Sequence, residues 1–262
     1  MNKDLAYYED AYIFGVEAEV LSCVKGKKGY EIVLEDTAFY PEGGGQLCDI
    51  GTLNGFKVFD VREKDGKVVH YCEGEVEVGS LAKGEIDWNR RYDHMQNHTG
   101  EHMVSGIIHQ LFGYENVGFH MSDDHILVDY DGVLSEEDIK RVEDLANGFI
   151  RNHVDVVITY PDEDVLELID FRSKKELSGT VRIVEIPGCD ICACCGTHVR
   201  NTAEVNLIKI VSFEKHKEGT RLELLCGQRA LDDYQLKHEQ NTHLYQLYSV
   251  KPYEVEQAVV KA

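Results

Sequence analysis

The sequence predicts an α+β protein, in which a small N-terminal β-barrel precedes a domain with helices on a mainly antiparallel sheet. Three observations predict this class. Short strand-like runs with glycine-rich turns fill residues 11–87, and a helical pattern follows over residues 91–112. Further strand-like runs then mix with helical ones over residues 117–248.

Four short runs predict the barrel. Residues 14–21 partly alternate between apolar and polar side chains, and residues 29–35 show a similar pattern, so each run predicts a strand. Residues 55–61 and 68–72 are two further strand candidates, and Lys-Asp-Gly-Lys at 64–67 predicts a hairpin turn between them. Short strands joined by glycine-rich turns are typical of small barrels.

Two helices are predicted in the middle of the chain. Met103, Ile107 and Leu111 recur at helical spacing, and Gly113 favours a helix end. Ser135 before three acidic residues is a helix start, because the serine caps free amides and the acids meet the positive end of the helix dipole. We expect strands at residues 117–131, 154–160, 181–186, 205–213 and 220–226.

The tail from residue 229 to about 248 is predicted to be helical, with Leu231, Tyr234 and Tyr245 roughly on one side. A further helical pattern reaches Ala262, so we expect either that the natural protein continues or that this end packs on a partner. A homodimer through the C-terminal helix is one such arrangement. The expected domains are 1–88 for the barrel, 89–228 for the α+β domain and 229–262 for the helical segment.

Charge and composition limit the function classes. The net charge of −21 opposes simple nucleic-acid binding, because phosphates attract Lys and Arg. The N-terminus lacks the layout of a signal peptide, and no run of about 18 apolar residues predicts a membrane span. We therefore expect a cytoplasmic protein with no membrane partner, whose eight cysteines serve as thiols or metal ligands.

Two pairs of residues predict a metal site. His98 and His102 stand four residues apart on a predicted helix, so both imidazoles share one face. Such a pair alone is as often a surface or core feature. Cys194 and His198 form a second pair, which needs a turn that Gly196 permits.

Together the pairs give three nitrogens and one thiolate, which is an ordinary zinc set. Cys194 and Cys195 compete for the thiolate position, and the four-residue spacing to His198 favours Cys194. Cys192 could also approach the metal. We expect one Zn²⁺ per chain.

Three motifs resemble those of the alanyl-tRNA editing family, the long-type AlaX proteins that are free-standing relatives of the editing domain of alanyl-tRNA synthetase. They are Phe-Tyr-Pro-Glu-Gly-Gly-Gly-Gln at 39–46, Asn-His-Thr-Gly-Glu-His at 97–102 and Cys-Cys-Gly-Thr-His-Val at 194–199. Their order and spacing agree, and the likeness covers roughly residues 10–230. The resemblance implies an N-terminal barrel before a zinc-dependent editing domain. It also implies hydrolysis of serine or glycine from the tRNA made for alanine.

Residues around the motifs are candidates for the chemistry. The candidate catalytic side chains are Glu101, Thr99, Gln46 and Thr197. Glu101 is equally well explained as a solvated or capping acid. The candidate substrate-binding residues are Gly43, Gly44, Gly45, His120 and Arg90.

Two alternatives come from other function classes. His98-x-x-Glu101-His102 also matches the H-x-x-E-H pattern of inverted zinc proteases, in which Glu101 would be the base. That interpretation leaves Cys194, His198 and the Gly-Gly-Gln segment unexplained. The second alternative is a zinc-stabilised module that binds tRNA or a protein partner without catalysis, because four protein ligands are typical of a structural zinc.

Overall fold

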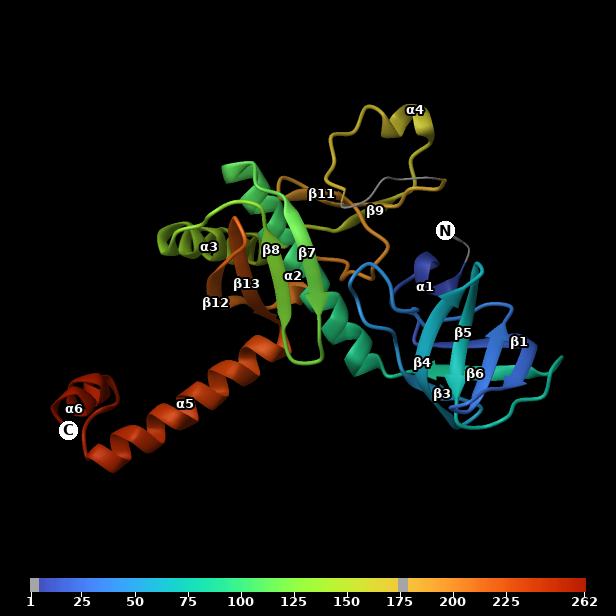
Figure 1. Ribbon diagram of the computed structural model, residues 1–262, viewed down its shortest axis with the longest axis horizontal. Helices are drawn as coiled ribbons and strands as arrows, with labels where there is room; N and C mark the ends of the chain where they lie inside the picture. The colour runs from blue at the N-terminus through green and yellow to red at the C-terminus, as the bar shows by residue number, and fades with distance from the viewer. Residues whose placement is uncertain (1–4, 174–178) are drawn as a thin grey trace.

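The structure is a computed structural model that describes residues 5–173 and 179–262 (Figure 1). Its first part is a closed barrel with the strand order β1-β2-β5-β4-β3-β6, all neighbours antiparallel. The strands are β1 (Gly15–Lys25), β2 (Tyr30–Leu34), β3 (Gly51–Leu53), β4 (Phe56–Lys64), β5 (Lys67–Cys72) and β6 (Leu81–Ile86). The predicted barrel is therefore confirmed, and a short helix, α1 (Ala6–Glu9), lies beside it.

Alternation of burial explains the barrel strands. In β6 every second side chain is buried, as a strand with one face on a core requires. The inward residues Val20, Ile32 and Leu53 have no exposed surface. Between β4 and β5, Asp65 and Gly66 both have positive φ, which fits the tight hairpin turn predicted there.

A 25-residue helix, α2 (Trp88–Phe112), leads out of the barrel. Asp87 caps its first turn by accepting a hydrogen bond from the backbone N–H of Arg90, and Gly113 ends it in the left-handed conformation. Sixteen of its residues are buried, so α2 is a central helix rather than a surface one. This burial on nearly all sides explains why polar side chains from this helix reach the interior.

A buried ion pair fixes α2 against the barrel. The guanidinium of Arg91 and the carboxylate of Asp49 are both fully buried, and Arg91 also donates to the backbone carbonyls of Ala11 and Ala38. Asp49 in turn accepts a hydrogen bond from the backbone N–H of Tyr40. Residues 38–49 form a glycine-rich loop around Gly43–Gly45. Its two ends, at Ala38–Tyr40 and Asp49, are thus tied to the first turn of α2.

The second half holds two antiparallel sheets where the sequence analysis expected one. A three-stranded sheet has the order β11-β10-β9, and a four-stranded sheet has the order β12-β13-β8-β7. Their strands are β7 (Asn116–Met121), β8 (Ile126–Tyr130), β9 (Val157–Thr159), β10 (Ile183–Ile186), β11 (Asp190–Ala193), β12 (Ile208–His216) and β13 (Gly219–Cys226). The mixed α+β class is confirmed, and β11 is a strand that the sequence analysis did not predict.

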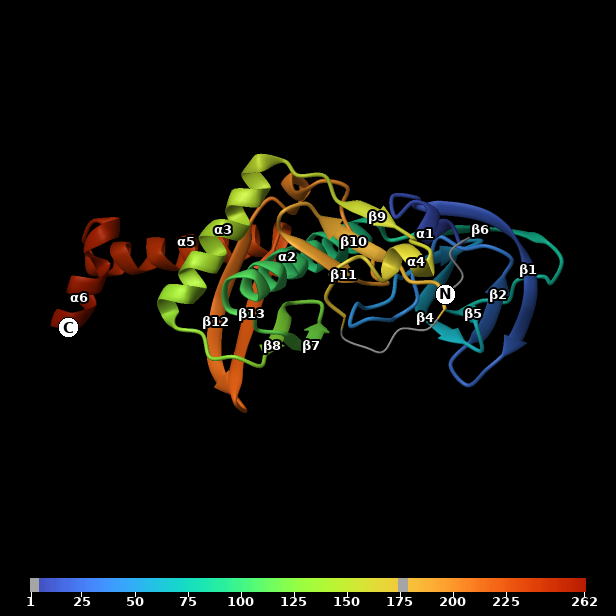
Figure 2. The ribbon, with the colours of Figure 1, turned by 90° about the horizontal axis from the view of Figure 1, so that it is seen from above.

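Helices cover these sheets. Helix α3 (Glu136–Asn152) begins at the predicted Ser135, which forms a reciprocal capping box with Asp138. Figure 2 shows α3 lying along β12, with α2 between the sheets. One core cluster joins the buried residues of α2 and α3 to those of β8 and β13.

The C-terminal helices leave the body of the molecule. Helix α5 (Gln228–Tyr248) extends away from the sheets and carries α6 (Val255–Lys261) at its far end (Figure 1). Only Ala230 of α5 is buried, while Leu231, Tyr234 and Leu247 are exposed. The predicted helix is confirmed, and the homodimer through it stays a prediction. The remaining short elements are α4 (Glu163–Leu166) and the 3-10 helices Thr202–Val205 and Pro252–Glu254. Among the described residues, no helix combines the length and apolarity that a membrane span needs.

Candidate metal centre

Helix α2 presents the first pair of predicted ligands. His98 and His102 are 1% and 3% exposed, and their ring centroids lie 5.3 Å apart. The four-residue spacing puts both rings on one face of the helix, as predicted. Burial of two imidazoles on one helix face requires partners for their ring nitrogens.

The chain after β11 presents the second pair. Cys194 follows directly on the strand, and His198 is 1% exposed. Gly196 between them is needed for a reason that the sequence analysis did not give. Its φ is not positive, but a Cβ at this position would overlap the ring of His98. Only a glycine lets this segment approach α2 so closely.

The four side chains converge on one point. The possible ligand atoms of His98, His102, Cys194 and His198 all lie within 4.8 Å of one another. Sγ of Cys194 lies 3.4 Å from Nε2 of His98, and the ring centroid of His198 lies 4.6 Å from each of the other two rings. Cys194 belongs to this group, whereas Cys195 is exposed and lies outside it.

The residues fit a metal ion. Nε2 of His198 is buried and has no hydrogen-bond partner among the described residues, and it belongs to a group of four potential ligand atoms. Burial by itself raises the pKa of Cys194, but the neighbouring His98 and His102 hold that pKa well below its usual range. A thiolate and three imidazoles are the donors that zinc prefers.

Polar side chains contact the imidazole rings of this group. Nδ1 of His98 lies 2.8 Å from Oε1 of Gln46, and Nδ1 of His198 lies 3.2 Å from Oγ1 of Thr99. Gln46 also donates from Nε2 to Oγ1 of Thr197 at 2.9 Å. The structure therefore brings two of the four predicted catalytic residues, Gln46 and Thr99, to these rings and a third, Thr197, to Gln46.

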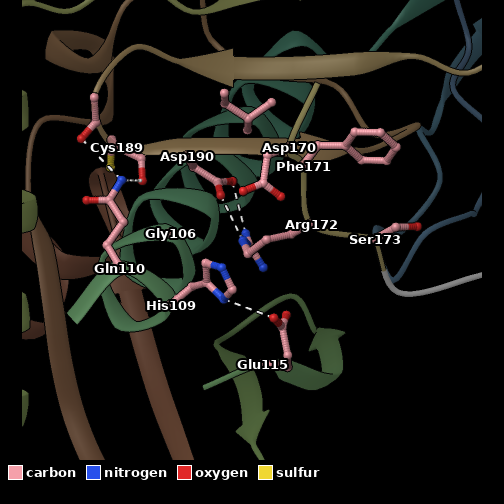
Figure 3. A pocket seen from close by; sticks show the side chains of 12 residues that line it. Gly106, His109, Gln110, Glu115, Asp170, Phe171, Arg172, Ser173, Cys189 and Asp190 are labelled. Atoms are coloured by element: carbon pink, nitrogen blue, oxygen red, sulfur yellow. Dashed lines mark hydrogen bonds and ion pairs between the residues drawn. The ribbon is translucent and has the colours of Figure 1, made fainter. Parts of the chain in front are cut away.

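His102 has an ionic partner that the sequence analysis missed. Its Nδ1 lies 2.9 Å from Oδ2 of Asp190, the first residue of β11. Both oxygens of this carboxylate also accept hydrogen bonds from the guanidinium of Arg172, which Figure 3 shows pointing towards Asp190. Burial alone lowers the pKa of His102, but Cys194 and Asp190 raise it to about 9.

A hollow of about 360 Å³ opens in front of the ligands. Its wall includes Gly44 and Gly45 from the barrel and Phe119 from β7. The ring of Phe119 stacks on His98, with centroids 5.2 Å apart and planes 25° apart. The backbone N–H of Met121 donates to the carbonyl of Gly45 at 3.2 Å, which joins the glycine-rich loop to β7. The hollow is therefore formed jointly by the barrel and the second half.

Four predicted residues lie elsewhere, and one of them, Gly43, lines a separate hollow beside Tyr7 and Tyr8. His120 is exposed, because side chains alternate along β7 and its neighbour Phe119 takes the inward position. Arg90 pairs with Asp123 and lines a different hollow. Glu101 is 1% exposed and does not line the hollow, and its carboxylate accepts hydrogen bonds from Ser105 at 2.6 Å and from Asn116.

Comparisons with known proteins agree with this arrangement. Residues 2–90 match the model of the class II (A) tRNA synthetases, and residues 181–223 match the threonyl and alanyl tRNA synthetase second additional domain. The alanyl-tRNA editing protein AlaX-L of Pyrococcus horikoshii is 36% identical over 237 residues, which cover 86% of this chain and 58% of the relative. Aarsd1-A of Xenopus laevis is 35% identical over 239 residues, with 85% and 58% covered.

The chain belongs to the alanyl-tRNA editing protein family. It spans 58% of the length of the first two relatives. The alanine–tRNA ligase of Ignicoccus hospitalis is 31% identical over 240 residues, which cover 87% of this chain and 26% of the ligase. The likeness to the ligase fits the resemblance to a synthetase editing domain.

Asp190, Arg172 and Phe119 were not predicted from the sequence to lie at this site. Asp190 stands only four residues before Cys194, so the sequence did contain a signal that an acid lies near the proposed ligand. Phe119 is the strand neighbour of the predicted His120. Arg172 gave no local signal, because it lies 18 residues from Asp190 and its role depends on the pairing of its backbone with β11.

Proposed function

We propose that this chain deacylates mischarged tRNA, releasing serine or glycine from the tRNA made for alanine. The proposed cofactor is one zinc ion, held by His98, His102, Cys194 and His198. The observation that carries the proposal is the convergence of these four side chains beside a hollow that His98, His102 and Cys194 line and that the barrel completes. The substrate class is supported by the relatives, which are alanyl-tRNA editing proteins.

Zinc, when bound here, would supply a positive charge that polarises an ester carbonyl and helps to orient the aminoacyl end. The protein's own residues have separable tasks. Gly44 and Gly45 let the barrel loop approach a substrate closely, because no side chain intervenes. Phe119 closes one side of the hollow, and a volume of about 360 Å³ suits a small aminoacyl group rather than a folded peptide.

Gln46, Thr99 and Thr197 take an orienting role in this proposal. Gln46 and Thr99 contact ligand rings directly, and Thr197 fixes the amide of Gln46. Each imidazole can then direct Nε2 towards the metal, because its Nδ1 is held by a neighbour. Glu101 bonds to Ser105 and Asn116, which favours a buried structural acid over a general base.

The decisive experiment is release of labelled serine from seryl-tRNA made on the alanine tRNA. Fast release that a chelator abolishes and zinc restores supports the proposal. Equal release of alanine from correctly charged tRNA counts against proofreading specificity. The test uses the protein at a known zinc content, so that binding and catalysis are judged separately.

Two other outcomes point to the alternatives. A protein that holds one zinc yet releases no amino acid would be the zinc-stabilised binding module. A Cys194→Ser protein that keeps both zinc and peptidase activity would be an H-x-x-E-H peptidase. The contacts of Glu101 weigh against this second alternative, because a catalytic base needs access to the substrate.

A further inference from the structure

A chain of three buried side chains ends on His102. Oδ2 of Asp190 lies 2.9 Å from Nδ1 of His102 and accepts a hydrogen bond of 2.9 Å from Nη2 of Arg172. Oδ1 of Asp190 accepts from Nε of Arg172 at 2.8 Å. His102 is 3% exposed, Asp190 5% and Arg172 8%, so solvent screens their interaction little.

The backbone also fixes Arg172 beside β11. The backbone N–H of Arg172 donates to the carbonyl of Ile191 at 2.9 Å, and the N–H of Ala193 donates to the carbonyl of Arg172 at 2.9 Å. Arg172 thus pairs in parallel with Cys192 at the centre of β11. Two main-chain bonds and a two-pronged side-chain contact leave the guanidinium little freedom, which is the arrangement that planar recognition of a carboxylate needs.

We propose that Asp190 and Arg172 are positioning residues for the zinc site. Asp190 accepts a hydrogen bond from Nδ1–H of His102. This bond keeps the proton on Nδ1 and directs the lone pair of Nε2 towards Cys194 and His198. Arg172 holds the carboxylate in the orientation that this bond requires. A carboxylate behind a zinc-binding histidine commonly raises metal affinity in this way. The inference rests on the proposed zinc ligands, but not on the proposed hydrolysis.

Zinc affinity is the direct measure of this role. We expect Asp190→Ala and Arg172→Met to bind zinc about 10–100-fold more weakly than the natural protein, in competition with a chromogenic chelator. Arg172→Lys should fall between, because lysine keeps the charge but not the two-pronged contact. This conservative variant also serves if Arg172→Met does not fold.

A matched control separates positioning from general stability. Arg229 makes a similar two-pronged contact with Asp93 of α2, at 2.9 and 3.0 Å from Nε, and its side chain is 9% exposed. This pair contacts none of the four ligands. Arg229→Met should lower the midpoint of thermal unfolding as Arg172→Met does, while zinc affinity stays within about twofold of the natural value, given how weakly distant sites couple.

Chemical rescue gives a second readout. Arg172 lines a hollow of about 560 Å³ between α2 and the segment at Asp170–Ser173 (Figure 3). A guanidinium ion can enter there when the side chain is removed. In Arg172→Ala, guanidinium below denaturing concentration should restore most of the zinc affinity, and Arg229→Ala should not respond. The visible spectrum of the cobalt-substituted protein should shift in Asp190→Ala, because the ring of His102 loses its fixed orientation.

Unchanged zinc affinity in Asp190→Ala and Arg172→Met, with zinc lost in Cys194→Ser, would overturn the inference and leave the proposed function intact. Natural protein that binds zinc but releases no amino acid would defeat the proposed function. The affinity series would still decide the roles of Asp190 and Arg172. Natural protein that binds no zinc would overturn both.

Discussion

Oε1 of Gln46 lies 2.8 Å from Nδ1 of His98, and this contact joins the glycine-rich loop of the barrel to the metal helix. The same oxygen accepts a hydrogen bond of 3.0 Å from the backbone N–H of Thr197. Gln46 is fully buried and contacts both the proposed ligand His98 and Thr197, the neighbour of the proposed ligand His198. One amide therefore couples the barrel, α2 and the segment after β11.

Replacing Gln46 should impair the site without unfolding the protein. Gln46→Met keeps the volume but leaves Nδ1 of His98 and the N–H of Thr197 without an acceptor, at about 1–3 kcal/mol each. We expect serine release to fall about tenfold or more. Gln96→Met is the control. Gln96, on α2, is buried like Gln46, but it donates to the backbone carbonyl of Glu204 instead of contacting a proposed ligand. Equal losses in both variants would contradict an orienting role.

The ligand set predicts which cysteine holds the metal. Cys194→Ser and His98→Ala should lose zinc or bind it far more weakly, because each removes one of four converging atoms. Cys195→Ser should keep one zinc per chain, since Cys195 is exposed and outside that group. Elemental analysis of the three purified proteins is the measurement. Full zinc content in both Cys194→Ser and His98→Ala would exclude this site.

The glycine-rich loop should tolerate alanine at one position and not at another. A Cβ on Gly45 would overlap the ring of Phe119, and its φ of +87° is strained for alanine. Gly43 has no positive φ, and its nearest neighbour would be Tyr40 Oη at 3.5 Å. Gly45→Ala should therefore lower both the rate of serine release and thermal stability. Gly43→Ala should stay close to the natural protein in both assays, and the reverse order would be inconsistent with this loop geometry.

Acid should destabilise the barrel through His70. Burial lowers the pKa of His70 to about 4, and its ring lies between Oγ1 of Thr37 at 2.8 Å and the carbonyl of Ile32 at 3.1 Å. The unfolded chain binds a proton near pH 6.5, while the folded one does so only near pH 4. Stability is therefore unaffected above pH 6.5 and falls as the pH drops from 6.5 to 4, by roughly 3 kcal/mol in all.

Denaturant unfolding of the natural protein and of His70→Gln at several pH values tests this effect. The natural protein should lose more stability between pH 6.5 and pH 4 than the variant, which has no proton to bind at this position. Parallel pH profiles would refute it. The comparison isolates His70, because other buried histidines such as His94 are present in both proteins.

Local patterns in the sequence determined most of the architecture. Alternation predicts four of the six barrel strands, while β3 and β6 went unpredicted. Helical spacing with a terminal glycine predicts α2, because both patterns depend on neighbours along the chain. The same spacing places His98 and His102 on one helix face. The division into two sheets and the strand β11 went unpredicted, since a short apolar run does not specify its partner strand.

Only the tertiary structure decided which further side chains reach the site. Phe119 rather than His120 faces the hollow, because the direction of the strand selects one of two neighbours. For the thiolate, the sequence spacing already favoured Cys194 over Cys195, and the structure brings Cys194 to the histidines. Gln46 meets His98 across 52 residues, and Arg172 meets Asp190 across 18. Such contacts follow from how the barrel, helix and sheets pack together, whereas sequence periodicity describes only one element at a time.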